Sequence, residues 1–145
     1  MIGIVVVGHG KMAEELIKSA EMIMGKQDKI FPVHLTEEMG PETLVEEVKK
    51  AVGLCASEEG VLILTDLYGG STTNFVAANL ISSGYRVEIV SGVNLPMLLS
   101  VLCERTDLNL AKLAEKAVMD GKEGIMNVRK ILNLDSISQE TKSGG

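Results

Sequence analysis

The sequence contains no tryptophan, two tyrosines, two phenylalanines and two cysteines among its 145 residues, and its net charge is −6. The scarcity of aromatic side chains and the lack of any run of lysine or arginine argue against nucleic-acid binding, which usually needs a basic patch and stacking platforms. Cys55 and Cys103 lie in apolar helical patterns and not in a Cys-x-x-Cys motif. We therefore predict two buried thiols in a reducing compartment.

No apolar stretch approaches the roughly 20 residues needed to cross a membrane. The apolar stretch 2–7 is too short for a signal peptide and lacks a basic start and a small-residue cleavage site. We therefore expect a cytoplasmic protein without membrane insertion. With 46% apolar and 23% charged residues, a chain of this length is expected to form one domain. We place that domain at 1–132 and a loose, serine- and glycine-rich tail at 133–145.

Predicted strands and helices alternate along this domain. Apolar, β-branched runs indicate strands, and apolar residues at helical spacing indicate amphipathic helices. The predicted strands are 2–7, 30–35, 61–65 and 86–90. The predicted helices are 11–24, 41–55, 75–81, 96–103 and 109–119. For the segment 124–132 the pattern leaves a short strand and a helix equally open.

This alternation predicts an α/β fold whose mainly parallel sheet carries helices on both faces, connected by right-handed βαβ units. Pro32 cannot donate a hydrogen bond to a neighbouring strand, so the strand 30–35 is expected at a sheet edge. The doubly wound order 2-1-3-4 satisfies this condition and places the first and third strands side by side at the switch point. Ligands are expected there, at the loops 8–10 and 66–74.

His9 is the first candidate for chemistry at this point. Gly8 and Gly10 flank it, so the backbone can turn tightly and leave the imidazole accessible. A histidine in a turn is more often an ordinary surface residue, but the neighbouring loop carries Asp66 at the end of the adjacent strand. That carboxylate could accept the Nδ1–H of His9 and leave Nε2 as a nucleophile. Alternatively, Asp66 only accepts hydrogen bonds within its own loop.

The segment Gly69-Gly70-Ser71 is the second candidate. It opens a helix, whose free N–H groups and positive dipole end suit an anion such as a phosphoryl group, and Ser71 offers a hydroxyl donor. Ser71 could equally be a simple helix cap. Together with His9 and Asp66, this segment predicts a site for in-line phosphoryl transfer to an imidazole.

Other site types fit the sequence less well. A nucleotide-binding P-loop is excluded, because Val5 occupies the required glycine position and Met12 the required serine or threonine position. The second histidine, His34, lies on the predicted edge strand without spaced partners, so we predict no metal site and assign His34 a structural or solvent-facing role. The predicted chemistry needs no bound cofactor.

Four blocks of the sequence resemble a known family. They are Gly8-His9-Gly10, the helix end 20–25, the segment 60–66 with Gly69-Gly70-Ser71 and Asn74, and the segment 91–98. In this order and spacing they resemble the enzyme IIA domain of the mannose-class sugar phosphotransferase system, over residues 2 to about 132. The differences are Thr72, where relatives often have proline, and Tyr68, where they often have tryptophan.

The resemblance implies a phosphohistidine carrier. His9 would accept a phosphoryl group from the carrier protein HPr and pass it to an enzyme IIB, which serves a membrane sugar permease. Asp66 would orient His9, and Gly69, Gly70 and Ser71 would contact the phosphate. The resemblance also implies a homodimer, in which a C-terminal antiparallel strand from the segment 124–132 can be exchanged between subunits.

Two alternatives remain open at this point. One is the phosphocarrier subunit that feeds dihydroxyacetone kinase, against which the loop 66–71 and Asn94-Leu95-Pro96 argue. The other is a regulatory module on the same fold that transfers no phosphate, against which the intact His9 and Asp66 argue. The sequence does not indicate which sugar is transported.

Overall fold

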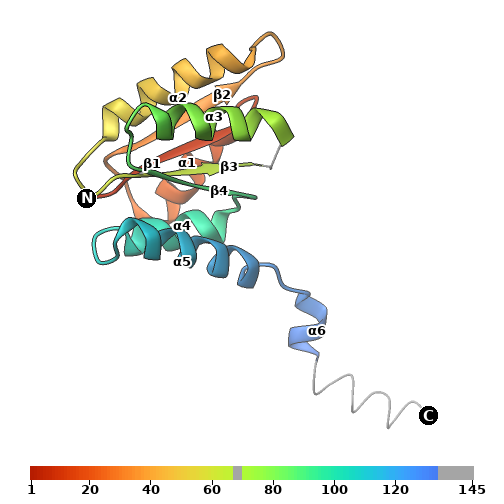
Figure 1. The fold of residues 1–145 in the computed structure, drawn as a ribbon. Coiled ribbons are helices and arrows are strands. Elements are labelled where there is room, and N and C mark those ends of the chain that lie inside the picture. The colour runs from red at the N-terminus through yellow and green to blue at the C-terminus, as the bar shows by residue number, and fades with distance from the viewer. Residues whose placement is uncertain (67–69, 134–145) are drawn as a thin grey trace.

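The computed structural model describes residues 1–66 and 70–133, with side chains described except at 70–72. Within these residues, parallel strands form one four-stranded sheet of order β2-β1-β3-β4 (Figure 1). The strands are β1 Gly3–His9, β2 Ile30–Leu35, β3 Val61–Thr65 and β4 Val87–Ser91. The predicted order is confirmed. Pro32 lies in β2 at the sheet edge. Its missing N–H therefore leaves no carbonyl oxygen of an inner strand without a hydrogen-bond donor.

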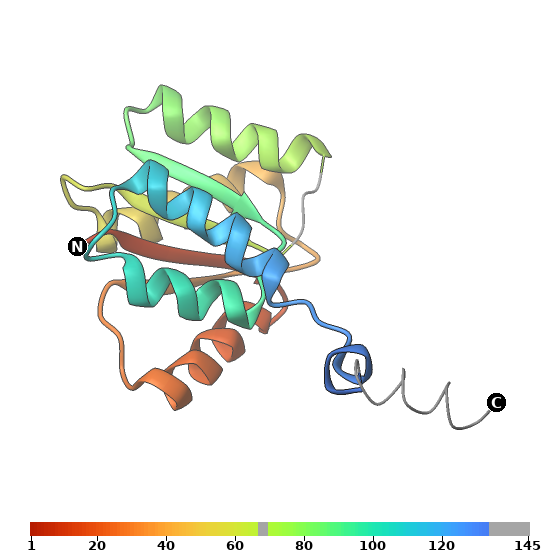
Figure 2. The same cartoon turned by 90° about the horizontal axis from the view of Figure 1, so that it is seen from below.

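Helices cover both faces of the sheet, as predicted. One face carries α2 and α3, and the other carries α1, α4 and α5 (Figures 1 and 2). Both views show α6 standing away from this layered body. The helices are α1 Met12–Met24, α2 Pro41–Cys55, α3 Gly70–Ser82, α4 Leu95–Glu104, α5 Leu110–Glu123 and α6 Val128–Leu132.

Strand β1 lies at the centre of the core. Ile4 and Val6 pack in the cluster under α1, α4 and α5, whereas Val5 and Val7 pack in the cluster under α2 and α3. Both faces of the strand are therefore buried, which explains its continuous apolar run. All its residues are buried until His9, which is exposed. Because β1 ends at His9, the chain leaves the core and reaches the surface at this residue.

Several element boundaries differ from the prediction. Helix α3 begins at Gly70, before the suggested cap Ser71 and before the apolar pattern that starts at Phe75, because the polar run before Phe75 has no apolar periodicity that could reveal the first helical turn. Strand β1 continues two residues further than predicted, because Gly8 and His9 pair with β2. Within 124–132, residues Val128–Leu132 form the helix α6, and no residue of this segment lies in a strand. Of the predicted tail, residues 134–145 lie outside the described residues, and the domain boundary at 132 stays a prediction.

The two cysteines differ in their surroundings. Cys55 is buried as predicted, and burial raises the pKa of its thiol to about 11, so the thiol is protonated at neutral pH. The prediction of a second buried thiol is wrong, because Cys103 is exposed. The buried face of α4 is formed by Met97, Leu98, Val101 and Leu102. Cys103 follows this face by one residue and is rotated by about 100° around the helix. No helix in the described part of the chain is long and apolar enough to span a bilayer.

Arg105, directly after α4, is only 2% exposed. Its Nη1 donates to the carbonyl oxygens of Lys29 (3.1 Å) and Ile2 (3.4 Å), and its Nη2 donates to the carbonyl oxygen of Asp28 (2.6 Å) and to Oε1 of Gln27 (3.2 Å). Burial lowers the pKa of the guanidinium, and the nearby charge of Asp28 opposes this shift. The side chain therefore ties the end of α4 to the starts of β1 and β2.

We expect Arg105→Met to lower the free energy of unfolding by about 2–4 kcal/mol, because backbone carbonyl groups then lose buried donors. Urea denaturation at neutral pH measures this loss. The matched control is Arg86→Met, since Arg86 is exposed and its guanidinium donates a single hydrogen bond among the described residues, to the carbonyl oxygen of Glu58 at 3.3 Å. The control is expected to change stability by less than about 0.5 kcal/mol. Equal losses in the two variants would contradict the role given to Arg105.

Candidate functional site

His9 sits where β1 ends at the carboxyl edge of the sheet. The next residue, Gly10, has φ +59°, a left-handed conformation that glycine adopts without strain, and its N–H donates to the carbonyl oxygen of Leu35 at 2.9 Å. The chain therefore turns sharply between β1 and α1, as the flanking glycines predicted. The turn leaves the His9 side chain 57% exposed.

Asp66 follows β3, the strand that pairs with β1 in parallel. Its backbone N–H donates to the carbonyl oxygen of Val7 at 3.1 Å, which extends the ladder by one step and brings its side chain beside His9. The Asp66 Oδ2 atom lies 2.7 Å from Nδ1 of His9 and accepts the His9 backbone N–H at 2.8 Å. The structure thus brings together the two residues that the sequence paired.

This contact determines which ring nitrogen is available. A carboxylate oxygen accepts hydrogen bonds, so Nδ1 of His9 carries the proton and Nε2 holds the lone pair when the ring is neutral. No described residue forms a hydrogen bond with Nε2. Because Asp66 also accepts the His9 backbone N–H, one oxygen holds both the ring and the main chain of His9. The Asp66 side chain is 20% exposed, so water weakens the electrostatic interaction between its carboxylate and the His9 ring only in part.

Four helices begin near the edge of the sheet at which His9 lies, and the fourth, α4, starts at Leu95 after β4. The other three follow β1, β2 and β3. Helix α1 starts at Met12, α2 at Pro41 and α3 at Gly70 (Figure 1). The N-terminal end of each helix carries a partial positive charge that stabilises a nearby anion. Gly70 and Ser71 of the predicted phosphate-contacting segment lie in the first turn of α3. Gly69 lies outside the described residues, so the contact of this segment with phosphate stays a prediction.

His34 also contributes to this region, and sequence reasoning missed its partners. In the parallel register His34 is opposite Gly8. Its Nδ1 is 3.0 Å from the carbonyl oxygen of Gly10, and its Nε2 is 3.8 Å from Oε2 of Glu14. His34 thus holds the turn that follows His9, which fits the structural role predicted for it. Only the strand register could have revealed these contacts. Among the described residues, no group of three or more potential ligands could hold a metal ion.

A cavity of about 200 Å³ adjoins His9 and Asp66. It lies on the sheet face that α2 and α3 cover, and Thr65 and Thr73 add polar groups to its wall. The other described lining residues are largely apolar and come from all four strands, from two helices and from the loop before α2. No local sequence pattern predicts such a cavity, because its lining residues are scattered between positions 7 and 89.

Comparison with protein families identifies relatives of this chain. Residues 3–118 match the family model EIIA-man, described as the PTS system fructose IIA component, where PTS is the phosphotransferase system. The matched region includes both His9 and Asp66.

Individual relatives agree with this match. The PTS system fructose-specific EIIA component of Bacillus subtilis is 36% identical over 113 residues, which are 78% of this chain and 77% of the relative. The PTS system mannose-specific EIIAB component of Escherichia coli K12 is 35% identical over 125 residues, and these cover 86% of this chain but only 38% of that longer protein. The crystal structure of phosphotransferase system component EIIA from Streptococcus agalactiae superposes with a TM-score of 0.79 at 26% identity, covering 90% of this chain and 99% of the other.

Proposed function

Because this chain belongs to the mannose-class enzyme IIA family of the sugar phosphotransferase system, we propose that it carries a phosphoryl group on His9 during sugar uptake. The observation that carries the proposal is the 2.7 Å contact between Nδ1 of His9 and Oδ2 of Asp66. The carboxylate accepts a hydrogen bond from Nδ1–H, so the ring proton stays on Nδ1 and Nε2 is available as a nucleophile in an exposed position.

The proposed transfer is a direct displacement at phosphorus. The lone pair of His9 Nε2 forms the new N–P bond, while the bond between phosphorus and the donor atom breaks and its electron pair leaves with the donor. The proton on Nδ1 stays in place. The ring becomes more positive as the bond forms, and the Asp66 carboxylate stabilises that charge. In the reverse sense, the same arrangement releases the phosphoryl group to the next acceptor.

The phosphoryl oxygens carry negative charge during this step. The N-terminal ends of α1, α2 and α3 stabilise that charge, and we propose that the backbone of Gly69 and Gly70 and the hydroxyl group of Ser71 contact the oxygens. The position of Gly70 and Ser71 in the first turn of α3 supports this proposal. No step requires a metal ion or another cofactor.

The partners that we propose are HPr as donor and an enzyme IIB as acceptor, through which the group reaches a sugar and its membrane permease. Cys55 and Cys103 form no disulfide, which supports a cytoplasmic location. A homodimer is also part of the proposal, since β4 forms a sheet edge among the described strands. Exchange of the segment 124–132 would require α6 to become a strand at that edge.

The family model and the relatives above are named for sugar transport, which favours sugar uptake over a role with dihydroxyacetone kinase. The second alternative is a regulatory module that transfers no phosphate. The phosphorylation experiment below distinguishes it from the proposed carrier.

The decisive experiment is a two-step relay followed by intact-mass spectrometry. Incubation with phosphoenolpyruvate, enzyme I and HPr is expected to add about 80 Da, the mass of one phosphoryl group on a nucleophile. Once the phosphorylated chain is separated from this donor mixture, addition of a mannose-class enzyme IIB is expected to remove the added mass and to phosphorylate the IIB protein. The control contains IIB and phosphorylated HPr without this chain. No gain in mass with active HPr would reject the proposed function in favour of a regulatory module.

A further inference from the structure

Two residues at the end of β2 hold the backbone that follows His9. Gly10 donates its N–H to the carbonyl oxygen of Leu35 at 2.9 Å, and its own carbonyl oxygen lies 3.0 Å from Nδ1 of His34. A carbonyl oxygen accepts hydrogen bonds, so Nδ1 of His34 is the donor. Glycine loses more conformational freedom on ordering than any other residue. The two contacts therefore fix the backbone position beside the nucleophile that would vary most without them.

The His34 ring lies on the face of the sheet opposite to the cavity that His9 lines. Val33 and Leu35 pack in the cluster under α2 and α3. Successive side chains of a strand point to opposite faces, so His34 points to the face that α1 covers. The His9 side chain belongs to the cavity on the α2 and α3 face. His34 is therefore separated from the reacting atoms, and an effect on His9 has to pass through the backbone.

Glu14 contacts the other nitrogen of the His34 ring. Its Oε2 atom lies 3.8 Å from Nε2 of His34, and Glu14 belongs to the first turn of α1. Gly8, which is opposite His34 in the strand register, lets α1 approach closely, because a Cβ atom there would lie 2.7 Å from Cε of Met12. The His34 ring thus joins both ends of the turn, the carbonyl group of Gly10 before α1 and the carboxylate of Glu14 within it.

We propose that His34 is a positioning residue for phosphoryl transfer at His9. This role, which rests on the proposed function, is exerted through the carbonyl oxygen of Gly10, and Glu14 keeps the His34 ring in place. Asp66 holds His9 itself at its ring and its backbone N–H, whereas His34 holds the residue that follows. Attack requires phosphorus within about 3–3.5 Å of the lone pair, and a displacement of about 1 Å can slow a reaction about 100-fold.

Two substitutions of His34 test the hydrogen bond. Leucine has no donor, whereas the amide group of glutamine can still donate to the carbonyl oxygen of Gly10. His34→Leu is expected to lower the maximal rate of labelling about three- to tenfold, the effect of losing one positioning hydrogen bond. The decrease is expected both with phosphorylated HPr and with phosphoramidate, a small donor that needs no protein interface. His34→Gln is expected to keep at least about half of the wild-type rate.

A second pair of variants tests the contact with Glu14. Glu14 and Glu15 both belong to the first turn of α1 and both pair with Lys18, at 3.5 Å and 3.3 Å. In the part of the chain that the structure describes, the His34 ring forms an ion pair with Glu14 alone. Glu14→Ala is expected to lower the maximal rate about two- to fivefold, the range for an exposed charge pair. The matched control Glu15→Ala is expected to change it less than about 1.5-fold.

Amide hydrogen exchange separates positioning from a general loss of stability. The Gly10 amide, which donates to Leu35, is expected to exchange at least about fivefold faster in His34→Leu than in the wild type, because the turn opens more often. The Val5 amide in the middle of β1 is expected to exchange at the wild-type rate. A residue that only stabilises the fold would change both amides together, and faster exchange at both would overturn the proposal.

The labelling rates decide the remaining outcomes. Wild-type protein that neither donor labels would reject the proposed function itself. If the wild type is labelled, a decrease of less than about threefold in His34→Leu overturns the positioning role. An equal decrease in His34→Leu and His34→Gln also overturns it, because the loss would then come from the ring and not from its donor. A higher half-saturating concentration of phosphorylated HPr with a normal phosphoramidate rate would make His34 a partner contact instead. If His34→Leu does not fold, equal rates in Glu14→Ala and Glu15→Ala overturn the proposal.

Discussion

Replacing His9 by glutamine is expected to abolish the acid-labile gain of about 80 Da that phosphorylated HPr produces on the wild-type protein. Glutamine keeps a polar side chain of comparable reach, but its amide nitrogen has no available lone pair and cannot attack phosphorus. Because the ring of His9 is exposed and outside the core, the substitution is expected to change stability by less than about 1 kcal/mol. The loss would therefore be chemical and not a consequence of unfolding.

The matched control is His34→Gln, which replaces the second of the two histidines in the chain. Its amide N–H can still donate to the carbonyl oxygen of Gly10, which His34 contacts at 3.0 Å. This variant is expected to gain the full phosphoryl mass. Intact-mass spectrometry before and after mild acid treatment measures both variants. A phosphoryl group retained by His9→Gln, or lost by His34→Gln alone, would assign the nucleophile to His34.

Substitution of Asp66 by asparagine is expected to slow phosphorylation of His9 by about 10²–10⁴-fold, the range typical for losing an orienting carboxylate beside a catalytic histidine. Two effects contribute. An amide carries no charge to stabilise the ring as it becomes positive, and its NH₂ group, if turned toward Nδ1, favours the tautomer in which Nε2 is protonated. In that tautomer Nε2 has no lone pair with which to attack phosphorus.

Rapid-quench measurement of the labelling rate tests this prediction, and the stoichiometry after long incubation should still approach one phosphoryl group per chain. Asp107→Asn serves as the matched control, since Asp107 is exposed and follows α4. The control is expected to react at the wild-type rate. A normal rate in Asp66→Asn would show that Asp66 only accepts backbone hydrogen bonds, such as that from the His9 N–H at 2.8 Å.

Much of the architecture was predictable because the relevant signals are local. The apolar runs and helical spacings located β2, β3 and α2 at the observed boundaries. The missing N–H of Pro32 placed β2 at the sheet edge and led to the observed strand order. The start of α3 was misplaced, because its first turn contains small polar residues that are equally common in loops. The exposure of Cys103 was misjudged, because adjacent residues of one helix point in different directions.

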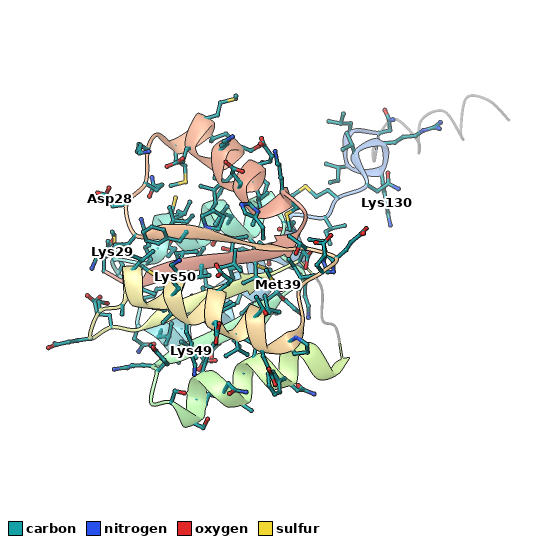
Figure 3. All side chains as sticks on the ribbon, turned by 90° about the horizontal axis from the view of Figure 1, so that it is seen from above. Asp28, Lys29, Met39, Lys49, Lys50 and Lys130 are labelled. Atoms are coloured by element: carbon teal, nitrogen blue, oxygen red, sulfur yellow. The ribbon has the colours of Figure 1, made fainter. Side chains whose placement is uncertain are left out.

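The candidate site was predictable only in part. Two glycines around His9 indicated an accessible turn, and the strand order predicted that Asp66 would lie nearby. The contacts of His34 with Gly10 and Glu14 depend on the pairing of β1 with β2. No spacing along the chain encodes that register. The backbone groups that Arg105 binds are far from the site. In Figure 3, Asp28 and Lys29, whose carbonyl oxygens accept from Arg105, lie at the end of the molecule away from Met39.

The sequence by itself determined the α/β class, the order of the strands, the turn that exposes His9 and the resemblance to a phosphocarrier family. These follow from residue spacing, glycine and proline positions and short motifs, all of which act over a few neighbouring residues. Only the tertiary structure decided the 2.7 Å contact between His9 and Asp66, the four hydrogen bonds of Arg105 and the apolar cavity. The physical reason is that these features join residues 57 to 103 positions apart or several separate elements. Their geometry is set by strand register and side-chain packing, which no local pattern contains.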